Sequence, residues 1–488
     1  MPSIKKNFLY SGILTTANIL FPLIVYPYVS RVLGVANIGL CNFIDSLINY
    51  FVLFSTLGIS VLGIREIAAA LKDRDKLNSA FSTLFILNVI TTAIMMVVLV
   101  LVTIFVTRLR DNWPLMIVGA FKLLFNVLLV EWLYKGLEEF RYITIRTLIV
   151  RVLYVVLVFL FVRNQSDYLI YYVLTTFMVV VNAIINMGHS RTFVTFSLKY
   201  LHLKEFVKPY CELGVYQILT SMYTSLNVAY LGFVATNTDV GYYTTAIKLY
   251  SIFLALFTAF TGVMLPRMSS LFAEDDIQSI KQYIAKSFSF LFAMTIPLVM
   301  FSIVNAEGII RLISGAGYEG AIVPMMLVMP LLLIVGSEQI LIEQVLMPIK
   351  KDKTVTINSF VGAGLGVLLN LLLVPHFLSI GSALVIAISE SAIFILAMIE
   401  VKRYLGYNYP WRDFFKRLLV YLPFLGMELL LLPFVESSLI RLLINSLVVI
   451  VYGLIVNQYI LRDYDILQLV RTVLGRREAE PANLKDGY

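Results

Sequence analysis

The sequence predicts an all-α protein that crosses a membrane many times. Hydrophobic residues make up 60% of the 488 residues and charged residues only 14%, whereas charged residues are about 25% of an average soluble domain. The hydrophobic residues gather in fourteen stretches, each close to the roughly 20 residues that a helix needs to cross a bilayer. Helices are expected because a backbone in lipid must satisfy its own hydrogen bonds.

The predicted spans follow one another with short loops between them. They are 8–33, 38–62, 80–106, 113–134, 143–162, 168–188, 210–234, 240–264, 287–305, 322–346, 355–375, 380–399, 414–434 and 438–460. The first is too long for the apolar core of a signal peptide and lacks a small-residue cleavage site, so we expect it to be retained. The sequence shows no metal-ligand cluster, nucleophile motif or phosphate-loop spacing. It therefore predicts neither an enzyme nor a metal or cofactor site.

The placement of Lys and Arg predicts the orientation, because positively charged loops tend to stay in the cytoplasm. With the N-terminus inside, the alternate inner loops hold most of the basic residues. The outer set is limited to Arg31, Arg108, Arg110, Arg163, Arg311 and Arg441. We therefore expect both termini in the cytoplasm. The net charge of +8 follows from this topology and requires no nucleic acid partner.

An internal repeat appears when the chain is shifted by 202 residues. The matched pairs are Gly12 with Gly214, Tyr28 with Tyr230, Gly39 with Gly241, Phe51 with Phe253 and Arg65 with Arg267. Spans 1 and 2 thus align with spans 7 and 8 without a gap. This pattern predicts two parallel halves, as in transporters that rock around a central site. The predicted division is a six-helix bundle over 1–208, a second over 209–403, two further helices over 404–461 and a tail over 462–488.

The first two spans carry a motif that resembles a known family. It reads Phe21-Pro22, then Tyr26-Pro27-Tyr28-Val29-Ser30-Arg31-Val32-Leu33-Gly34, Ile38-Gly39 and Gly63-Ile64-Arg65-Glu66. This resembles the bacterial polysaccharide flippases, the O-antigen and capsule repeat-unit translocases of the multidrug, oligosaccharidyl-lipid and polysaccharide exporter superfamily.

The resemblance implies two bundles in a V around a cavity lined by spans 1, 2, 7 and 8. It also implies a substrate, an undecaprenyl-pyrophosphate-linked oligosaccharide, that is flipped from the cytoplasmic to the outer leaflet of the bacterial inner membrane. Alternating access would move the headgroup, and no covalent chemistry would be performed. The implied partners are this lipid-linked oligosaccharide, membrane lipid and other polysaccharide-assembly membrane proteins.

Charged residues inside the spans are the first candidates for function, because a charge at mid-bilayer costs about 2.5–3.5 kcal/mol on insertion scales. Lys248 and Lys122 are predicted to bind substrate, since lysine offers a compact positive charge to a pyrophosphate. Alternatively, each lysine pairs with a carboxylate and locks the bundle. Asp45 lies one position from the repeat equivalent of Lys248. We expect these two to pair across the axis and hold the outer gate shut; otherwise Asp45 is hydrated in the outer vestibule.

Other polar residues of the spans complete the predicted site. Arg31, Arg65 and Arg267 at span ends would collect an anionic headgroup, or else reach to lipid headgroups as arginines at span ends commonly do. The predicted sugar-binding set is Asn18, Asn49, Asn227, Tyr28 and Tyr230. In lipid such side chains also bond helix to helix. Glu338 and Glu390 are candidates to bind a coupling proton or sodium ion, or are paired within their own bundle.

Two competing functions agree less well with the sequence. A multidrug exporter of the same superfamily would need an acidic or aromatic pocket for cations, and the motif and the lysines argue against it. A membrane polysaccharide polymerase would typically carry a large outer loop with functional charges. The longest outer loop predicted here is only about residues 306–321.

Overall fold

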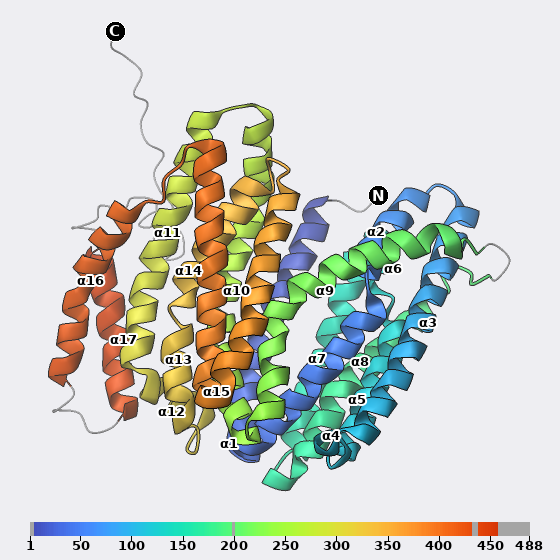
Figure 1. Cartoon of the computed structure of the whole chain (residues 1–488), viewed down its shortest axis with the longest axis horizontal. Helices are drawn as coiled ribbons and strands as arrows, with labels where there is room; N and C mark the ends of the chain where they lie inside the picture. Colours follow the sequence, from blue (N-terminus) through green and yellow to red (C-terminus); the bar gives the residue numbers. More distant parts are fainter. Residues whose placement is uncertain (1–3, 198–200, 432–437, 457–488) are drawn as a thin grey trace.

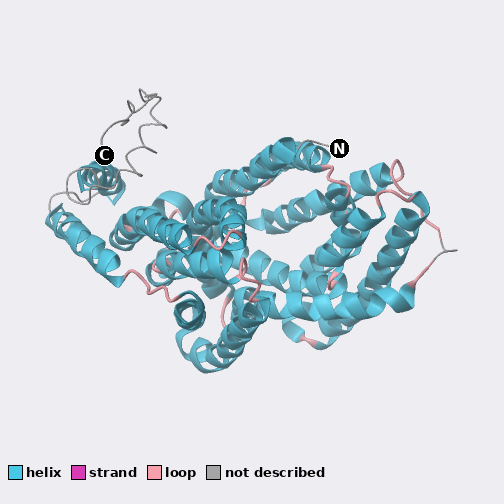
Figure 2. Ribbon diagram, turned by 90° about the horizontal axis from the view of Figure 1, so that it is seen from above, coloured by secondary structure: helices cyan, strands magenta, loops and turns pink. Residues whose placement is uncertain are grey.

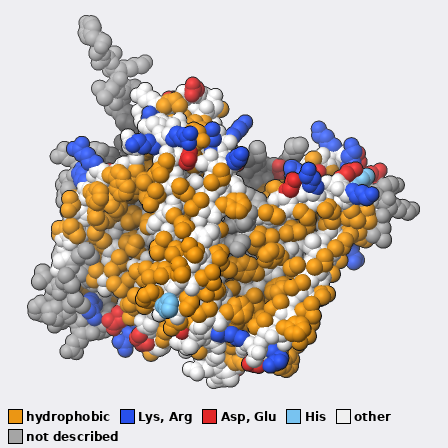
Figure 3. All heavy atoms as spheres, viewed as in Figure 1, with side chains coloured by type: hydrophobic (Ala, Val, Ile, Leu, Met, Phe, Trp, Pro, Cys, Tyr) orange, Lys and Arg blue, Asp and Glu red, His pale blue; other side chains and the backbone are white. Residues whose placement is uncertain are grey.

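The computed structural model describes residues 4–197, 201–431 and 438–456, and within these ranges every regular element is a helix (Figures 1 and 2). Nine of the helical segments in this described part are long and apolar enough to cross a membrane. On the face shown in Figure 3, hydrophobic side chains form a broad belt, with charged side chains gathered toward its upper and lower edges. These observations confirm the all-α, multi-pass membrane fold.

The helices have the following bounds. They are α1 (Ile4–Thr56), α2 (Ile59–Ala70), α3 (Arg74–Phe105), α4 (Thr107–Arg110), α5 (Trp113–Asn126), α6 (Glu131–Gly136), α7 (Phe140–Phe161), α8 (Tyr168–Ser190), α9 (Leu203–Val234), α10 (Asn237–Ala273), α11 (Ile277–Val304), α12 (Ala306–Ser314), α13 (Ile322–Val328), α14 (Leu331–Leu341), α15 (Asp352–Leu405), α16 (Trp411–Leu431) and α17 (Ser438–Ile455). Short 3₁₀ turns and one π-helical turn, Ile342–Leu346, join some of them.

The helices do not map one to one onto the predicted spans. Both α1 and α15 cover two spans each and contain a non-helical residue, Gly34 with φ 76° and Leu378 with φ 50°. The left-handed φ of Gly34 is one that glycine adopts without steric cost. Three more predicted spans correspond to α9, α16 and α17. The count of fourteen crossings therefore stays a prediction, and the predicted tail 462–488 lies outside the described residues.

One predicted span is irregular, and one assignment of charged residues is wrong. The span 113–134 contains a break, because α5 ends at Asn126 and a left-handed Val130, φ 37°, precedes α6. Residues Trp113–Gly136 as a whole are still long and apolar enough to cross a membrane, in agreement with the prediction. Counting the basic residues outside the outer set as inner-loop residues also includes Arg146 and Arg151, but both lie inside α7, as the predicted span 143–162 implies. Positive charge marks loops only on average, and a buried arginine with a partner or a cavity is an exception to that rule.

The chain forms two groups of helices with α1, α9 and α10 between them (Figure 1). We call α1–α8 the N-lobe and α9–α17 the C-lobe. Between the lobes α1 packs along α10, and α9 packs along α15 within the C-lobe. The predicted domain limits near residues 208 and 403 stay predictions.

The lobes meet closely at the end of the molecule where α1 bends at Gly34, which we call the Gly34 end; the opposite end is the Arg65 end. A Cβ atom added at Gly39 would lie 1.8 Å from the Asn237 carbonyl oxygen, and one at Gly241 would lie 2.3 Å from that of Val35. Only glycine permits helices to approach this closely. The crossing of α1 and α10 therefore closes the Gly34 end.

The contacts at this crossing follow the predicted repeat. Residues Val35 and Asn237 are separated by 202 positions, as are Gly39 and Gly241. In addition, Asn42 Nδ2 donates a hydrogen bond of 2.9 Å to Thr244 Oγ1, and these two residues are also 202 positions apart. Equivalent points of the two halves thus touch, as expected where a pseudo-two-fold axis passes between them.

Cysteine labelling of intact cells tests the predicted orientation. Lys72 is exposed between α2 and α3 at the Arg65 end, and Asn112 follows α4 at the Gly34 end. With cytoplasmic termini, an impermeant thiol reagent should miss Lys72→Cys and modify Asn112→Cys in a Cys211→Ser background. Labelling of Lys72→Cys from outside would show that the orientation is the reverse of the predicted one. Permeabilised cells serve as the control, because both cysteines should react there.

Candidate functional site

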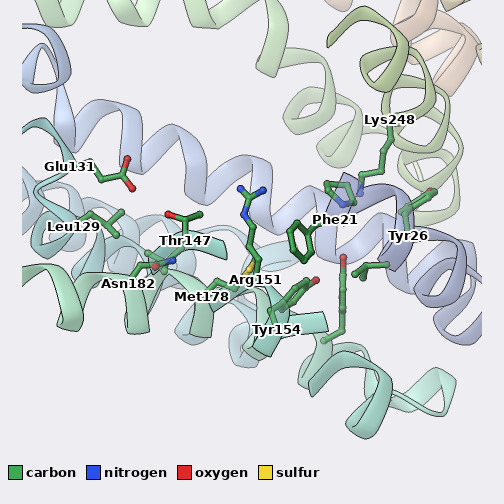
Figure 4. Close-up of a pocket in the computed structure, with 14 residues that line it drawn as sticks. Phe21, Tyr26, Leu129, Glu131, Thr147, Arg151, Tyr154, Met178, Asn182 and Lys248 are labelled. Atoms are coloured by element: carbon green, nitrogen blue, oxygen red, sulfur yellow. The ribbon is translucent and has the colours of Figure 1, made fainter. Parts of the chain in front are cut away.

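A cavity of about 390 Å³ opens between α1, α7 and α8 and reaches α10 at Lys248 (Figure 4). Its volume falls within the range of about 300–1,000 Å³ that is usual for small-molecule sites. The polar part of its wall consists of Tyr26, Glu131, Thr147, Arg151, Tyr154, Tyr171, Asn182 and Lys248. Two basic side chains, one carboxylate, three tyrosines, a threonine and an amide therefore converge inside the membrane part of the protein.

The Lys248 ammonium lies over an aromatic ring. Its Nζ is 4.3 Å from the centroid of Tyr26, at a distance typical of a cation–π contact. The Tyr26 hydroxyl and Thr245 Oγ1 share a hydrogen bond of 2.5 Å, which ties the ring of α1 to α10. Among the described residues Lys248 forms no ion pair, because Asp45 binds a different lysine. The structure thus holds a lysine charge at the cavity wall that no described carboxylate binds directly, with Asp45 as a countercharge farther away.

Arg151 is the second cation of the cavity, and sequence reasoning missed it. Its guanidinium lies 6.0 Å from the ring centroid of Phe21 and has no ion-pair partner in the described part of the chain. The carboxylate of the cavity, Glu131, is bound instead by Arg146 at 3.1 Å and by Lys135 at 3.8 Å. The sequence did contain a signal for this residue, because Arg151 falls inside the predicted span 143–162 and is therefore a charge within the membrane.

The structure does not form the predicted direct ion pair between Asp45 and Lys248, although the Asp45 carboxylate acts on Lys248 electrostatically. Lys122 Nζ lies 2.6 Å from Asp45 Oδ1 and also donates a 2.9 Å hydrogen bond to Asn49 Oδ1. Asn49 in turn donates to Asp45 at 3.1 Å. The alternative role weighed for Lys122, pairing with a carboxylate to lock the bundle, agrees with this geometry. The Lys122–Asp45 pair joins α5 to the second half of α1.

Removal of one partner of the Lys122–Asp45 pair should destabilise the folded protein. The side chains of Lys122 and Asp45 are 18% and 35% exposed. We therefore expect Lys122→Met to lower the free energy of unfolding by about 2 kcal/mol, less than the roughly 3–5 kcal/mol that loss of one partner costs in a fully buried pair. The double variant Lys122→Met/Asp45→Asn should recover part of the loss. Thermal unfolding of the purified protein measures this, and additive losses in the double variant would contradict the coupling.

Most of the predicted sugar-binding residues lie away from the cavity. The Tyr28 hydroxyl donates a 2.7 Å hydrogen bond to the Val162 carbonyl, and Asn227 donates one of 3.2 Å to the Tyr243 hydroxyl. Asn18 is exposed on the first half of α1, and Tyr230 is half-buried against the core between the lobes. These residues are not brought to the cavity wall, and their role in binding sugar stays a prediction.

The three predicted arginines also occupy different surroundings. Arg31 donates to the Leu312 carbonyl and thereby links α1 to α12 at the Gly34 end. Arg65 forms an exposed ion pair of 3.0 Å with Glu66. Arg267 lies 5.5 Å from the ring centroid of Tyr283. The structure explains Arg31 as a contact between the lobes, and capture of a headgroup by the other two stays a prediction.

Helical topology and a basic cavity within the bilayer define a multi-pass membrane transporter. The chain belongs to the polysaccharide biosynthesis protein family, whose model matches residues 4–272, more than half of the chain. A relative from Escherichia coli (strain K12), named as an O-antigen transporter, is 23% identical over 404 residues, which cover 82% of this chain and 97% of the relative. A second, from Shigella dysenteriae and also named as an O-antigen transporter, is 25% identical over 405 residues, 82% of this chain and 100% of the relative.

Solved structures show the same fold. The lipid II flippase MurJ in an inward closed conformation superimposes with a TM-score of 0.76 at 16% identity, over 92% of this chain and 99% of that protein. A multidrug resistance MATE family transporter in an inward-facing conformation gives a TM-score of 0.63 at 13% identity, over 82% of this chain and 98% of that protein. Both confirm the all-α, multi-pass fold that the resemblance implied. The cavity described above is lined mainly by predicted spans 1, 5 and 6, and of spans 2, 7 and 8 only span 8 contributes, through Lys248.

Proposed function

We propose that this protein flips undecaprenyl-pyrophosphate-linked oligosaccharide repeat units from the cytoplasmic to the outer leaflet by alternating access. The observation that carries the proposal is the pair of cations, Lys248 and Arg151, that face one cavity without ion-pair partners among the described residues. An unpaired charge inside a membrane protein is costly and usually marks a substrate path. Family membership and the named O-antigen transport of both curated relatives support the same function.

The chemistry of the cavity suits this headgroup. Attraction between a cation and a phosphate is much stronger in a medium of low dielectric constant than in water. Arg151 offers a planar fork of donors to phosphate oxygens, and Lys248 offers a point charge. Around them, Tyr154, Tyr171 and Asn182 provide aromatic faces and an amide for sugar rings. Transport requires no bond to be broken, so the residues of the cavity act by binding alone.

The closed Gly34 end supports a direction of access. With both termini in the cytoplasm, the crossing of α1 and α10 lies on the outer side of the inner membrane. The headgroup then reaches the cavity from the Arg65 end, while the lipid tail stays in the bilayer. Opening of this crossing would release the headgroup outside, and other polysaccharide-assembly membrane proteins would receive it.

A multidrug exporter is disfavoured by the same two cations. A cationic drug would meet Lys248 and Arg151 in the cavity, whereas Glu131 is already bound by Arg146 and Lys135. The cavity therefore repels the class of substrate that such an exporter carries.

Reconstitution into liposomes tests the proposed function. A fluorescent undecaprenyl-pyrophosphate oligosaccharide in both leaflets should become fully accessible to an impermeant quencher when the protein is present, but only half accessible in empty liposomes. A cationic dye should not be transported by the same preparation. Transport of the dye without movement of the lipid-linked oligosaccharide would assign the chain to drug export.

A further inference from the structure

A second cavity, of about 220 Å³, adjoins the cavity that holds Lys248 and Arg151. It lies between the second half of α1, the helices α2 and α3, and the segment that joins α5 to α6. Leu129 and Glu131 belong to the walls of both cavities. Figure 4 shows these two residues at one end of the first cavity and Lys248 with Tyr26 at the other. The second cavity therefore continues the first on the side away from Lys248.

The break between α5 and α6 shapes this second cavity. Val130, in the break, has a left-handed φ of 37°, which is unfavourable for a β-branched side chain. Such strain persists only where surrounding contacts enforce it, and it is common at binding sites. Close packing of α6 on α2 is one such contact, because a Cβ atom added at Gly63 would lie 2.7 Å from Trp132 Cε3. Gly63 belongs to the motif of the first two spans, and its small size lets Glu131 and Trp132 form part of the cavity wall.

The wall of the second cavity contains polar groups that have no partner in the described part of the chain. Asn88 Oδ1 and Trp132 Nε1 are buried without a hydrogen bond, and the two residues are only 3% and 6% exposed. The side chain of Asn126 is half-buried and also forms no hydrogen bond with a described residue. Buried polar groups are normally paired, since an unpaired one costs its full desolvation. These donors and acceptors are therefore available to a polar ligand.

Glu131 adds a carboxylate to this wall. Arg146 donates to its Oε1 at 3.1 Å, whereas Lys135 lies 3.8 Å from Oε2, beyond the length of a hydrogen bond. Oε2 can therefore accept a hydrogen bond from a ligand. The cation of the wall, Lys135, is paired with Glu131, so among its described residues the second cavity offers no unpaired positive charge to a phosphate. The carboxyl groups predicted for ion coupling, Glu338 and Glu390, are buried in the C-lobe outside both cavities, and that coupling stays a prediction.

The wall suits the hydroxyl groups of a sugar. Each sugar hydroxyl donates one hydrogen bond and accepts others, so it can pair with the amides, the carboxylate and the indole N–H described above. The volume of about 220 Å³ lies below the roughly 300–1,000 Å³ of sites for drug-sized ligands. The second cavity therefore has room for a single ring and not for a whole oligosaccharide.

We propose that the second cavity binds one sugar ring of the lipid-linked oligosaccharide, beyond the sugar that adjoins the pyrophosphate. The inference rests on the proposed function, in which Lys248 and Arg151 hold the pyrophosphate in the first cavity. From there the oligosaccharide extends past Leu129 and Glu131 into the second cavity. A carrier with a single sugar leaves this cavity empty, so the site distinguishes complete repeat units from incomplete ones.

The fluorescence of Trp132 reports occupancy of the second cavity. The chain contains three tryptophans, and Trp113 and Trp411 are exposed, so Trp113→Phe/Trp411→Phe leaves Trp132 as the single indole. A lipid-linked repeat unit prepared from the source bacterium should shift its emission, whereas undecaprenyl pyrophosphate with one sugar should not. Asn126→Ala in the same background should raise the concentration needed for half of the shift about fivefold, as expected for loss of one hydrogen bond. The control Asn408→Ala, exposed in the loop after α15, should match the parent.

An equal shift with the single-sugar lipid would overturn the proposal, as would unchanged binding of the repeat unit by Asn126→Ala. Should that variant fail to fold, the parent protein still provides the comparison between the two lipids. Flipping of the complete repeat unit in liposomes by a protein whose Trp132 emission does not respond would reject the second cavity and leave the transport function standing. Absence of both flipping and response would reject the transport function together with the sugar site.

Discussion

Simultaneous replacement of the two cavity cations, Lys248→Ala/Arg151→Ala, should abolish surface polysaccharide while the amount of protein in the membrane stays normal. Loss of one partner from a buried charge pair costs about 2–5 kcal/mol, and 1.4 kcal/mol is a factor of ten in affinity. Each single variant should therefore weaken headgroup binding by about 30-fold or more. Because neither side chain has an ion-pair partner among the described residues, their loss should not destabilise the fold.

Conservative variants separate charge from shape at this site. Lys248→Arg should retain part of the activity, because it keeps a charge near Tyr26. Arg151→Lys should retain less, because it loses the planar fork. The assay is polysaccharide on cells that lack the chromosomal gene and carry each variant. Lys402→Ala, at an exposed position in the last turn of α15, is the matched control, and full activity of the double alanine variant would refute the role of these cations.

Gly39→Val should prevent closure of the Gly34 end and stop transport. The added side chain would overlap the Asn237 carbonyl oxygen, which lies 1.8 Å from the position of a Cβ atom. Overpacking costs about 1–3 kcal/mol and occasionally more. Since the atom it meets belongs to the backbone, we expect about 3 kcal/mol, roughly a 100-fold fall in the closed population. The variant should fold, because the clash exists only while the lobes touch.

A disulfide between the lobes measures closure directly. Asn42→Cys and Thr244→Cys replace two side chains that are joined by a 2.9 Å hydrogen bond, and the background is Cys41→Ala/Cys211→Ser. The two cysteines should crosslink readily when residue 39 is glycine and poorly in the Gly39→Val variant. Gly364→Val is the control, because a Cβ there would meet nothing within 4 Å beyond its chain neighbours and the backbone of its own helix. Efficient crosslinking together with normal transport in Gly39→Val would show that the crossing is not a gate.

The architecture could be predicted because membrane spans depend on local composition alone. Apolar length and the placement of basic residues need no knowledge of tertiary contacts. The repeat added more, since the offset of 202 predicted that the halves are equivalent, and Gly39 and Gly241 meet at their interface. The motif around Tyr26 also marked the part of α1 that lines the cavity.

The partners of the charged residues could not be predicted in the same way. Position along a span gives the depth of a side chain in the bilayer, but not the direction in which it points around the helix axis. Lys122 and Lys248 were therefore equally good partners for Asp45, and packing of α5 against α1 decided for Lys122. Arg151 was missed because the orientation rule treats every arginine as a loop marker. Asn227 and Tyr28 form hydrogen bonds with Tyr243 and Val162 instead of facing the cavity. The rotation of each helix about its axis decides this, and the sequence alone does not give that rotation.

Calorimetric titration of the purified protein with inorganic pyrophosphate tests most directly whether Lys248 and Arg151 bind an anionic headgroup. The wild type should bind pyrophosphate with an affinity that falls as salt is added, because screening weakens charge attraction. Lys248→Ala/Arg151→Ala should show no binding, whereas the Lys402→Ala control should match the wild type. Equal binding by the double alanine variant and the wild type would contradict the account.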